Sequence, residues 1–420
     1  MITSAPIPLV HEVTCPNCWE RFPPERVRYV STHPDLYGDL RLGDQAHRRF
    51  LPTQFHPDGR AIDSLGGACH QLACPKCHLI VPRVMLERPT LFASVFGSPS
   101  SGKSFFLASM THQLRRTLPG TFCLNFSDAD PEANAILHHY ENTLFAPDSN
   151  TALVSLEKTE VTGSDKYQLV DFDGKKVRYP KPFFFQISPI KGHPNAQVIA
   201  KVSRTLCMYD NAGESFQPGA DRPDNPTTLH LAKSNCLIFI YDPTQEPAFR
   251  KALAKKSKDP QVSDAVTDRQ DVLLAEVARR VKTHRQMPMA AHHDKPMIVV
   301  VSKFDAWKTL IDGDMSPPWE PHSSGDISLL SRGRVEEMSS RVRRMLTEYA
   351  PGIVSTAESF VDPNKVLYVP VSATGGPPKL MEGGGLGYRA GSLSPAWVEV
   401  PLLHVLHQHV GGLVPSGKSA

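Results

Sequence analysis

A short glycine-containing loop between two apolar segments constrains this chain more than any other feature. Leu91–Phe96 is an apolar run, Gly97-Ser98-Pro99-Ser100-Ser101-Gly102-Lys103-Ser104 follows it, and a second apolar run begins at Phe105. This spacing matches G-x-x-x-x-G-K-[ST], a loop whose backbone N–H groups surround phosphate oxygens at a helix N-terminus. Glycine permits the turn and the close approach of the anion. We therefore predict a strand, a phosphate-binding loop and a helix from Lys103 to about Leu118.

Individual positions of this loop carry separate expectations. Lys103 would reach the β- and γ-phosphates, and the Ser104 hydroxyl would ligate Mg²⁺. The other residues expected to line the nucleotide are Gly97, Ser98, Ser101, Gly102 and Phe105. The alternative is a Ser/Gly-rich turn that merely precedes a helix. The apolar strand before the loop and the helix after it favour phosphate binding.

A second polar loop follows another apolar strand. In LCMYDNAGES, Asp210 ends the strand and Gly213 comes three residues later. A carboxylate beside the phosphate loop can hold the Mg²⁺ shell, and a glycine lets a backbone N–H meet a γ-phosphate. Taken alone the pattern is weak, because Asp210 could simply cap the strand.

Two further loops point to the base of the nucleotide. Ser302-Lys303-Phe304-Asp305 follows the apolar run Met297–Val301, and Ser372-Ala373 follows Val366–Val371. The Asp305 carboxylate can accept hydrogen bonds from guanine N1–H and its exocyclic amine, whereas adenine offers no such pair. A backbone N–H at Ser372-Ala373 could meet the guanine carbonyl. All four loops would meet at the carboxyl edge of one parallel sheet, where ligands bind.

These four motifs, over roughly residues 90–373, resemble the P-loop GTPases of the translation-factor and Ras-like class. The resemblance implies an α/β fold with a doubly wound, mostly parallel sheet, and GTP or GDP with Mg²⁺ as ligands. A zinc-ribbon-like N-terminus ahead of such a domain is similar to the bacterial "double-GTPase" proteins of multi-protein conflict or defence systems. That likeness implies an activator or effector protein as partner.

The chain departs from the GTPase pattern in three places. Ser302 stands where Asn or Thr is usual, so we expect it to brace the phosphate loop less well. Glu214 stands where a Gln commonly orients the attacking water, and an ionised carboxylate cannot donate a hydrogen bond. Slow, partner-stimulated hydrolysis is therefore expected. For the switch threonine, Thr159 is the first candidate, with Thr151 and Thr162 as rivals.

Two cysteine pairs lie ahead of the nucleotide motifs. Cys15-Pro16-Asn17-Cys18 and Cys74-Pro75-Lys76-Cys77 are two C-P-x-C turns, which together offer four thiolates to a structural Zn²⁺. The separation is longer than in a usual ribbon, so an insertion must loop out. Redox activity is the alternative, and substitute ligands are possible: Cys69, His70 and His78. Cys123, Cys207 and Cys236 are expected to be buried in apolar strands.

Strands alternating with helices predict the domain organisation. We expect a zinc-ribbon-like module at 1–88 and a nucleotide domain at 89–415, the latter with insertions at 143–200, 243–295 and 374–395. Within the first insertion, a hairpin is predicted from Tyr167–Phe172, the turn Asp173-Gly174 and the following strands, Lys176–Tyr179 and Phe183–Ile187.

Composition excludes some functions. Of the 420 residues 40% are hydrophobic, and 46 Lys plus Arg nearly balance 43 Asp plus Glu at a net charge of +3. This balance gives no sign of bulk nucleic-acid or membrane binding. No apolar run approaches a membrane span and no signal peptide is evident, so we expect a cytoplasmic protein. A scaffold that scarcely hydrolyses GTP, a P-loop ATPase and a nucleic-acid-binding zinc ribbon remain alternatives.

Overall fold

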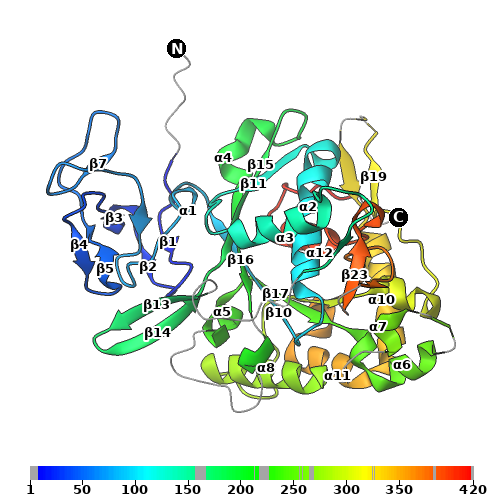
Figure 1. Cartoon of the computed structure of the whole chain (residues 1–420). Helices are drawn as coiled ribbons and strands as arrows, with labels where there is room; N and C mark the ends of the chain where they lie inside the picture. The colour runs from blue at the N-terminus through cyan, green and yellow to red at the C-terminus, as the bar shows by residue number, and fades with distance from the viewer. Residues whose placement is uncertain are drawn as a thin grey trace.

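Figure 1 shows a computed structural model of the chain. It describes residues 8–156, 167–211, 213–216, 227–254, 256–257, 259–263, 269–323, 325, 327–381 and 385–417. None of the described helices is long and apolar enough to cross a membrane.

A large central sheet organises the molecule. Within the described residues its strands follow the order β11-β15-β16-β10-β17-β18-β21. β15 is antiparallel to both neighbours, and the pairs from β16 to β21 are all parallel. The prediction of an α/β fold with a mostly parallel sheet is confirmed. The strands are β10 (Thr90–Gly97), β11 (Leu124–Asp128), β15 (Phe183–Pro189), β16 (Arg204–Asp210), β17 (Cys236–Tyr241), β18 (Met297–Val301) and β21 (Val366–Pro370).

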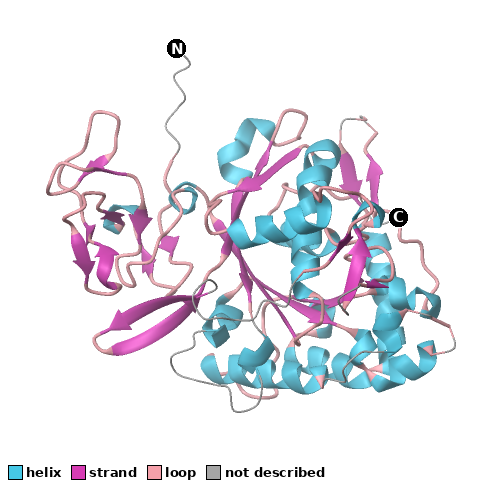
Figure 2. Cartoon of the chain, viewed as in Figure 1, coloured by secondary structure: helices cyan, strands magenta, loops and turns pink. Residues whose placement is uncertain are grey.

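Helices gather in two groups around this sheet (Figure 2). One group includes α2 (Lys103–Phe122), which packs on α3 (Ala135–Phe145). In the other, α8 (Gln270–His284) contacts α5 (Thr227–Lys233) and α11 (Pro351–Phe360), and α11 contacts α10 (Arg332–Tyr349). The remaining helices are α1 (Val84–Glu87), α4 (Ile199–Val202), α6 (Pro247–Leu253), α7 (Pro260–Ser263), α9 (Phe304–Trp307) and α12 (Val400–His409).

The helix after the phosphate loop is longer than predicted. α2 continues through Pro119 to Phe122, and Cys123 ends it in the left-handed region at φ 49°. Proline inside a helix costs about 3 kcal/mol. Leu118 and Phe122 are fully buried, and burying two such side chains contributes a comparable amount. Cys123 is therefore a buried helix cap rather than a strand residue, whereas Cys207 and Cys236 are buried in strands as predicted.

The predicted hairpin is only partly correct. β13 (Tyr167–Phe172) and β14 (Lys175–Pro180) pair across the turn Asp173-Gly174, whose two φ angles are positive, as the tight hairpin turn requires. Phe183–Pro189, however, leaves the hairpin and becomes β15 of the central sheet. Its apolar side chains on both faces are buried there, which a two-stranded ribbon in solvent could not provide.

Shorter strands complete the fold. The N-terminal module, blue in Figure 1, contains β1 (Val13–Thr14), β2 (Arg21–Phe22), β3 (Arg28–Val30), β4 (Tyr37–Asp39), β5 (Gly43–His47), β6 (Arg49–Phe50), β7 (Ala61–Ile62), β8 (Ala68–Cys69) and β9 (Leu72–Ala73). Elsewhere lie β12 (Leu153–Val154), β19 (Trp319–Pro321), β20 (Ser328–Leu330), β22 (Lys379–Leu380) and β23 (Leu386–Arg389). β12, β23 and β22 form one small sheet.

Candidate nucleotide site and metal centre

The predicted phosphate loop joins β10 to the N-terminus of α2. Ser100 and Gly102 have φ angles of 61° and 90°, so the chain turns sharply twice within the loop. The Lys103 Nζ donates to the carbonyl oxygens of Gly97 and Ser98, both at 3.0 Å. A Cβ atom at Gly97 would lie 2.4 Å from the Ile240 carbonyl oxygen, so only glycine fits. The ammonium group thus lies inside the curve of the loop, where an anion would meet it.

The D-x-x-G segment lies against this loop. Asp210 pairs with Val95 in the sheet, and the Asn211 backbone N–H donates to the Val95 carbonyl at 2.9 Å. A Cβ atom at Gly213 would lie 2.5 Å from the Gly97 carbonyl oxygen. The Asp210 Oδ1 is buried and has no hydrogen-bond partner among the described residues. An acceptor without a donor suits coordination to a cation.

Two glutamines support the phosphate loop, and sequence reasoning missed both. The Ser98 hydroxyl lies 3.1 Å from the Gln245 Oε1 and 3.2 Å from the Gln270 Oε1. The Gln245 Nε2 donates to the Pro99 carbonyl at 3.2 Å. Gln270, at the start of α8, also bonds the Asp242 backbone N–H and carbonyl. No short motif marks these residues, because they reach the loop from distant positions in the chain.

The base-reading loop contacts the phosphate loop directly. The Ser302 hydroxyl lies 3.0 Å from the Ser101 carbonyl oxygen and 3.1 Å from that of Tyr241. We expected Ser302 to hold the phosphate loop less well than Asn or Thr. Its hydroxyl nevertheless contacts the loop directly, because β17, β18 and the phosphate loop are close enough for a serine side chain to reach. The Trp307 indole N–H donates to the Ser302 carbonyl at 2.8 Å, and this bond helps to hold the turn after β18.

Asp305 and Ser372 meet across the ends of two neighbouring strands. The Ser372 hydroxyl donates to the Asp305 Oδ1, and the Gly375 N–H donates to the Ser372 Oγ at 2.8 Å. The Asp305 Oδ2 is buried and has no hydrogen-bond partner among the described residues. Burial raises the pKa of this carboxyl group, although the bond from Ser372 opposes that rise. A ligand with N–H donors would satisfy the free oxygen.

Two further contacts hold these loops. The Lys303 Nζ forms a 2.6 Å ion pair with the fully buried Asp242, which follows β17. Ala373 accepts a 2.7 Å hydrogen bond from the Ser109 hydroxyl of α2. Each predicted base loop is therefore tied to another element at the same sheet edge as Lys103. The four loops therefore lie together at one edge of the sheet, as the sequence interpretation requires.

For the other predicted site residues the structure gives the position in the fold but few contacts. Ser104 and Phe105 lie in the first turn of α2, and Gly213 begins a short 3₁₀ helix that includes the backbone of Glu214. Thr159 and Thr162 fall outside the described residues, as does the Glu214 side chain. Thr151 is exposed, and its hydroxyl lies 2.9 Å from that of Ser149.

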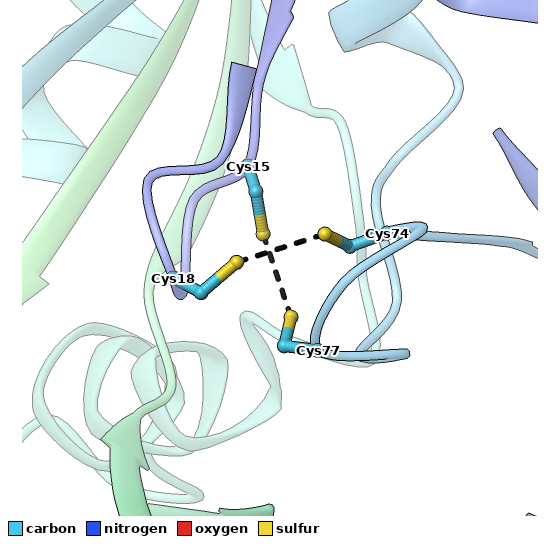
Figure 3. A group of neighbouring side chains, drawn as sticks. All are labelled: Cys15, Cys18, Cys74 and Cys77. Carbon is cyan, nitrogen blue, oxygen red and sulfur yellow. Dashed lines mark hydrogen bonds between the residues drawn. The ribbon is translucent and has the colours of Figure 1, made fainter. Parts of the chain in front are cut away.

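The four predicted metal ligands come together (Figure 3). Cys15, Cys18, Cys74 and Cys77 have all four Sγ atoms within 4.8 Å of one another, and among the described residues no other such group occurs. The distance is 3.6 Å between the Sγ atoms of Cys15 and Cys77 and 3.7 Å between those of Cys18 and Cys74. Four sulfurs at 2.3 Å around a tetrahedral Zn²⁺ would be about 3.8 Å apart. The thiol set therefore fits zinc.

The two cysteine turns have the same geometry. In each, the residue after the second cysteine has a left-handed φ, 60° at Trp19 and 63° at His78. In each, a backbone N–H donates to the first cysteine's sulfur at 3.4 Å, from Asn17 to Cys15 and from Lys76 to Cys74. Such bonds to thiolate sulfurs orient metal ligands.

The alternative ligands take other partners. The His78 Nδ1 lies 2.9 Å from both carboxylate oxygens of Asp39, and the Cys69 Sγ lies 3.6 Å from the Asp63 Oδ2. His70 is exposed. None of the three belongs to the four-thiol cluster.

The first cysteine turn, Cys15–Trp19, packs on the central sheet and is called the metal turn below. Ring centroids of Trp19 and Phe92 are 4.6 Å apart, and the Trp19 indole donates to the His230 Nδ1 of α5 at 3.0 Å. The hydroxyl of Tyr209, the β16 residue directly before Asp210, donates to the Pro16 carbonyl. Burial lowers the pKa of His230 to about 3, so the ring stays neutral and accepts the indole hydrogen. Sequence patterns gave no signal for these contacts.

Neither a protein-family model nor a curated protein matches this sequence. Among solved structures, it matches sup35 complexed with GDP at 12% identity and a TM-score of 0.23, over 68% of this chain and 38% of that one. Two structures of the S. cerevisiae Ski7 GTPase-like domain also match, one bound to GTP and one bound to GDP and inorganic phosphate. Each has 11% identity, a TM-score of 0.27 and a match over 68% of this chain. The match covers 43% of the GTP-bound chain and 44% of the other. This chain thus spans less than half the length of these proteins. At such TM-scores the likeness carries no weight, and the assignment of the site rests on its own geometry.

Proposed function

We propose that this protein binds guanine nucleotide with Mg²⁺ and hydrolyses GTP slowly, as a switch that a protein partner stimulates. The observation that carries the proposal is the contact between the two ends of the site. Ser302, the residue directly after the buried strand β18, bonds the phosphate loop through Ser101, and Asp305 follows three residues later. The loops that carry Lys103 and Asp305 therefore contact each other at one edge of the sheet, which supports a single ligand held by both.

Guanine is the base that this edge suits. The buried Asp305 Oδ2 lacks a donor among the described residues, and guanine supplies two N–H groups to such a carboxylate. Adenine would leave the carboxylate buried and unsatisfied, which costs about 1–3 kcal/mol. Discrimination of ten- to a hundredfold between the two bases follows.

The phosphate end would hold the metal ion. Ser104 and Asp210 would hold Mg²⁺, whose chemistry is to neutralise charge on the β- and γ-phosphate oxygens. Lys103 would exchange its carbonyl partners for phosphate oxygens, and the backbone of Gly213 would adjust against Gly97. Glu214 follows at the position where a water-orienting residue is expected, and its negative charge would disfavour attack on a phosphate.

The four-thiol cluster would hold a structural Zn²⁺. Its role in the proposal is to stabilise a segment with little core of its own and to fix it on the sheet. Action within a multi-protein defence or conflict system is a prediction from the resemblance alone, and a cytoplasmic location is a prediction from the short apolar runs and the N-terminal sequence.

The test is the nucleotide preference of purified protein. We expect GDP or GTP to bind in the presence of Mg²⁺ and ATP to bind at least tenfold more weakly, measured by calorimetry. Asp305→Asn should weaken GTP and improve xanthosine triphosphate, because the amide reverses one hydrogen-bonding position. Equal affinity of the wild type for ATP and GTP, or an unchanged base preference in Asp305→Asn, would reject guanine recognition.

A further inference from the structure

Tyr388 belongs to none of the predicted motifs, yet it lies among the residues of the proposed base site. Its ring packs edge to face on Phe105 of α2, with 5.4 Å between the ring centroids. Its hydroxyl lies 3.2 Å from the Gln261 Oε1 and also interacts with the side chain of Thr374. Phe105 directly follows the phosphate-loop serine, and Thr374 directly follows Ser372-Ala373. Tyr388 thus contacts residues beside both the phosphate loop and the Ser372-Ala373 loop.

The segment that carries Tyr388 begins and ends at the base loop. Ser372 and Ala396 exchange backbone hydrogen bonds at 3.1 and 2.8 Å, and the Ser394 N–H donates to the Thr374 carbonyl at 3.0 Å. Gly375 has φ 82°, and a Cβ atom there would lie 2.3 Å from the Ser394 carbonyl oxygen. The two ends of the segment are therefore fixed beside Ser372, the hydroxyl partner of Asp305.

A second set of bonds holds Tyr388 from the other side. β23 pairs with β12 in the register Val154 with Tyr388, and the Ala390 N–H donates to the Ala152 carbonyl at 3.0 Å. The Gly391 N–H donates to the Asn150 carbonyl at 2.9 Å. The ring is consequently placed by main-chain contacts on both flanks rather than by its own packing alone.

The surroundings keep the phenol neutral. Burial, with the nearby carboxylates of Asp305 and Asp259, raises the pKa of Tyr388. The hydroxyl can therefore donate to Gln261 while the ring presents an apolar, polarisable surface. An aromatic ring beside a carboxylate that accepts N–H groups is the combination that holds a purine, because stacking and edge recognition act on different parts of the base.

We propose that Tyr388 forms a wall of the guanine pocket, packing against the base whose N–H groups bind Asp305, and that Gln261 holds the ring in place. The inference rests on the proposed function and deepens it. Loss of one base–aromatic contact raises the dissociation rate of the nucleotide rather than slowing its arrival. We expect Tyr388 to act mainly on the residence time of GDP.

The experiment measures dissociation of fluorescent N-methylanthraniloyl-GDP from the full-length protein by stopped flow. Tyr388→Ala should release it about tenfold faster than wild type, and Tyr388→Phe, which loses only the hydroxyl contacts with Gln261 and Thr374, about twofold to threefold faster. Tyr37→Ala is the control, because that tyrosine is 44% exposed in the N-terminal module. Tyr388→Leu, expected to give about a threefold increase, replaces the alanine variant if that variant does not fold.

The outcomes separate the two proposals. A wild-type rate in Tyr388→Ala or Tyr388→Leu, with GDP binding intact and guanine preference still lost in Asp305→Asn, overturns the tyrosine wall alone. A wild-type protein that binds no guanine nucleotide overturns the proposed function and the wall together. Faster release from the Tyr388 variants, with a wild-type rate in Tyr37→Ala, supports the wall.

Discussion

The cysteine turns and the nucleotide loops depend on the rest of the chain to different extents. Each cysteine turn is formed within six residues, with the same left-handed φ and the same N–H-to-sulfur bond in both copies. The nucleotide site instead depends on contacts between distant residues, such as Ser98 with Gln270 and Ser302 with Ser101. A local motif can thus be recognised completely from sequence, whereas a distributed site can be recognised only in its loops.

The largest expected effect tests the local site. Cys74→Ser should lose bound zinc and lower the free energy of unfolding by about 5 kcal/mol, because metal binding contributes directly to folding of such modules. Zinc content by mass spectrometry and chemical denaturation measure the two quantities. Cys69→Ser is the matched control, since Cys69 is equally buried but lies outside the cluster. Stoichiometric zinc in Cys74→Ser would contradict the four-thiol site.

The next effect tests the distributed site. Lys103→Ala should weaken GTP binding by about a hundredfold, since one ammonium group would bond two phosphate oxygens. Zinc content should not change, because the cysteine turns do not involve this loop. Calorimetry gives the affinity, and Lys176→Ala, on the exposed hairpin, is the control. Loss of zinc from Lys103→Ala would show that the two sites are not independent.

A smaller effect tests the contact between the two regions. Trp19→Phe removes the indole N–H that bonds His230 and should lower the free energy of unfolding by about 1 kcal/mol. A double-mutant cycle with His230→Phe isolates that bond from the packing of the rings. A coupling energy indistinguishable from zero would mean that packing alone joins the metal turn to α5.

The last predicted effect is a dependence on pH, comparable in size to that of Trp19→Phe. Burial lowers the pKa of His230 to about 3, against about 6.5 in the unfolded chain, so below pH 6.5 the unfolded state binds the extra proton. Stability should therefore fall with decreasing pH, by up to about 1.4 kcal/mol per pH unit from this residue. Denaturation of wild type and His230→Gln from pH 7 to 5.5 measures the difference. Parallel curves would exclude a buried neutral histidine.

The same contrast explains what could be predicted from the sequence. β18 is predicted to the residue, because a continuous apolar run suits a strand buried on both faces. The predicted end of α2, at about Leu118, is wrong, because burial of Phe122 outweighs the tendency of Pro119 to end the helix. β15 is misassigned because it pairs with β11, from much earlier in the chain, and with β16, the strand that follows it, rather than with the hairpin strand before it.

Site residues divide in the same way. Lys103, Asp210 and Asp305 stand in short motifs that follow strands, and the topology then brings them to one edge. Gln245, Gln270 and Tyr388 reach the site from a 3₁₀ helix, the start of α8 and the short strand β23, whose sequences resemble any solvated segment. The hydrogen bonds of these residues are seen only in the structure. Contacts between side chains that are far apart in the chain follow no periodic pattern in the sequence.

The attachment of the metal turn has a mechanical consequence for the segment between Asp210 and α5. Tyr209, just before that segment, donates to Pro16, and His230, just after it, accepts from Trp19. Both flanks of this segment are thus held by the Cys15–Trp19 turn, and a Zn²⁺ bound by the four thiols, as proposed, would stiffen that turn. Depletion of the metal would then also loosen the attachment of a loop that has no cysteine of its own.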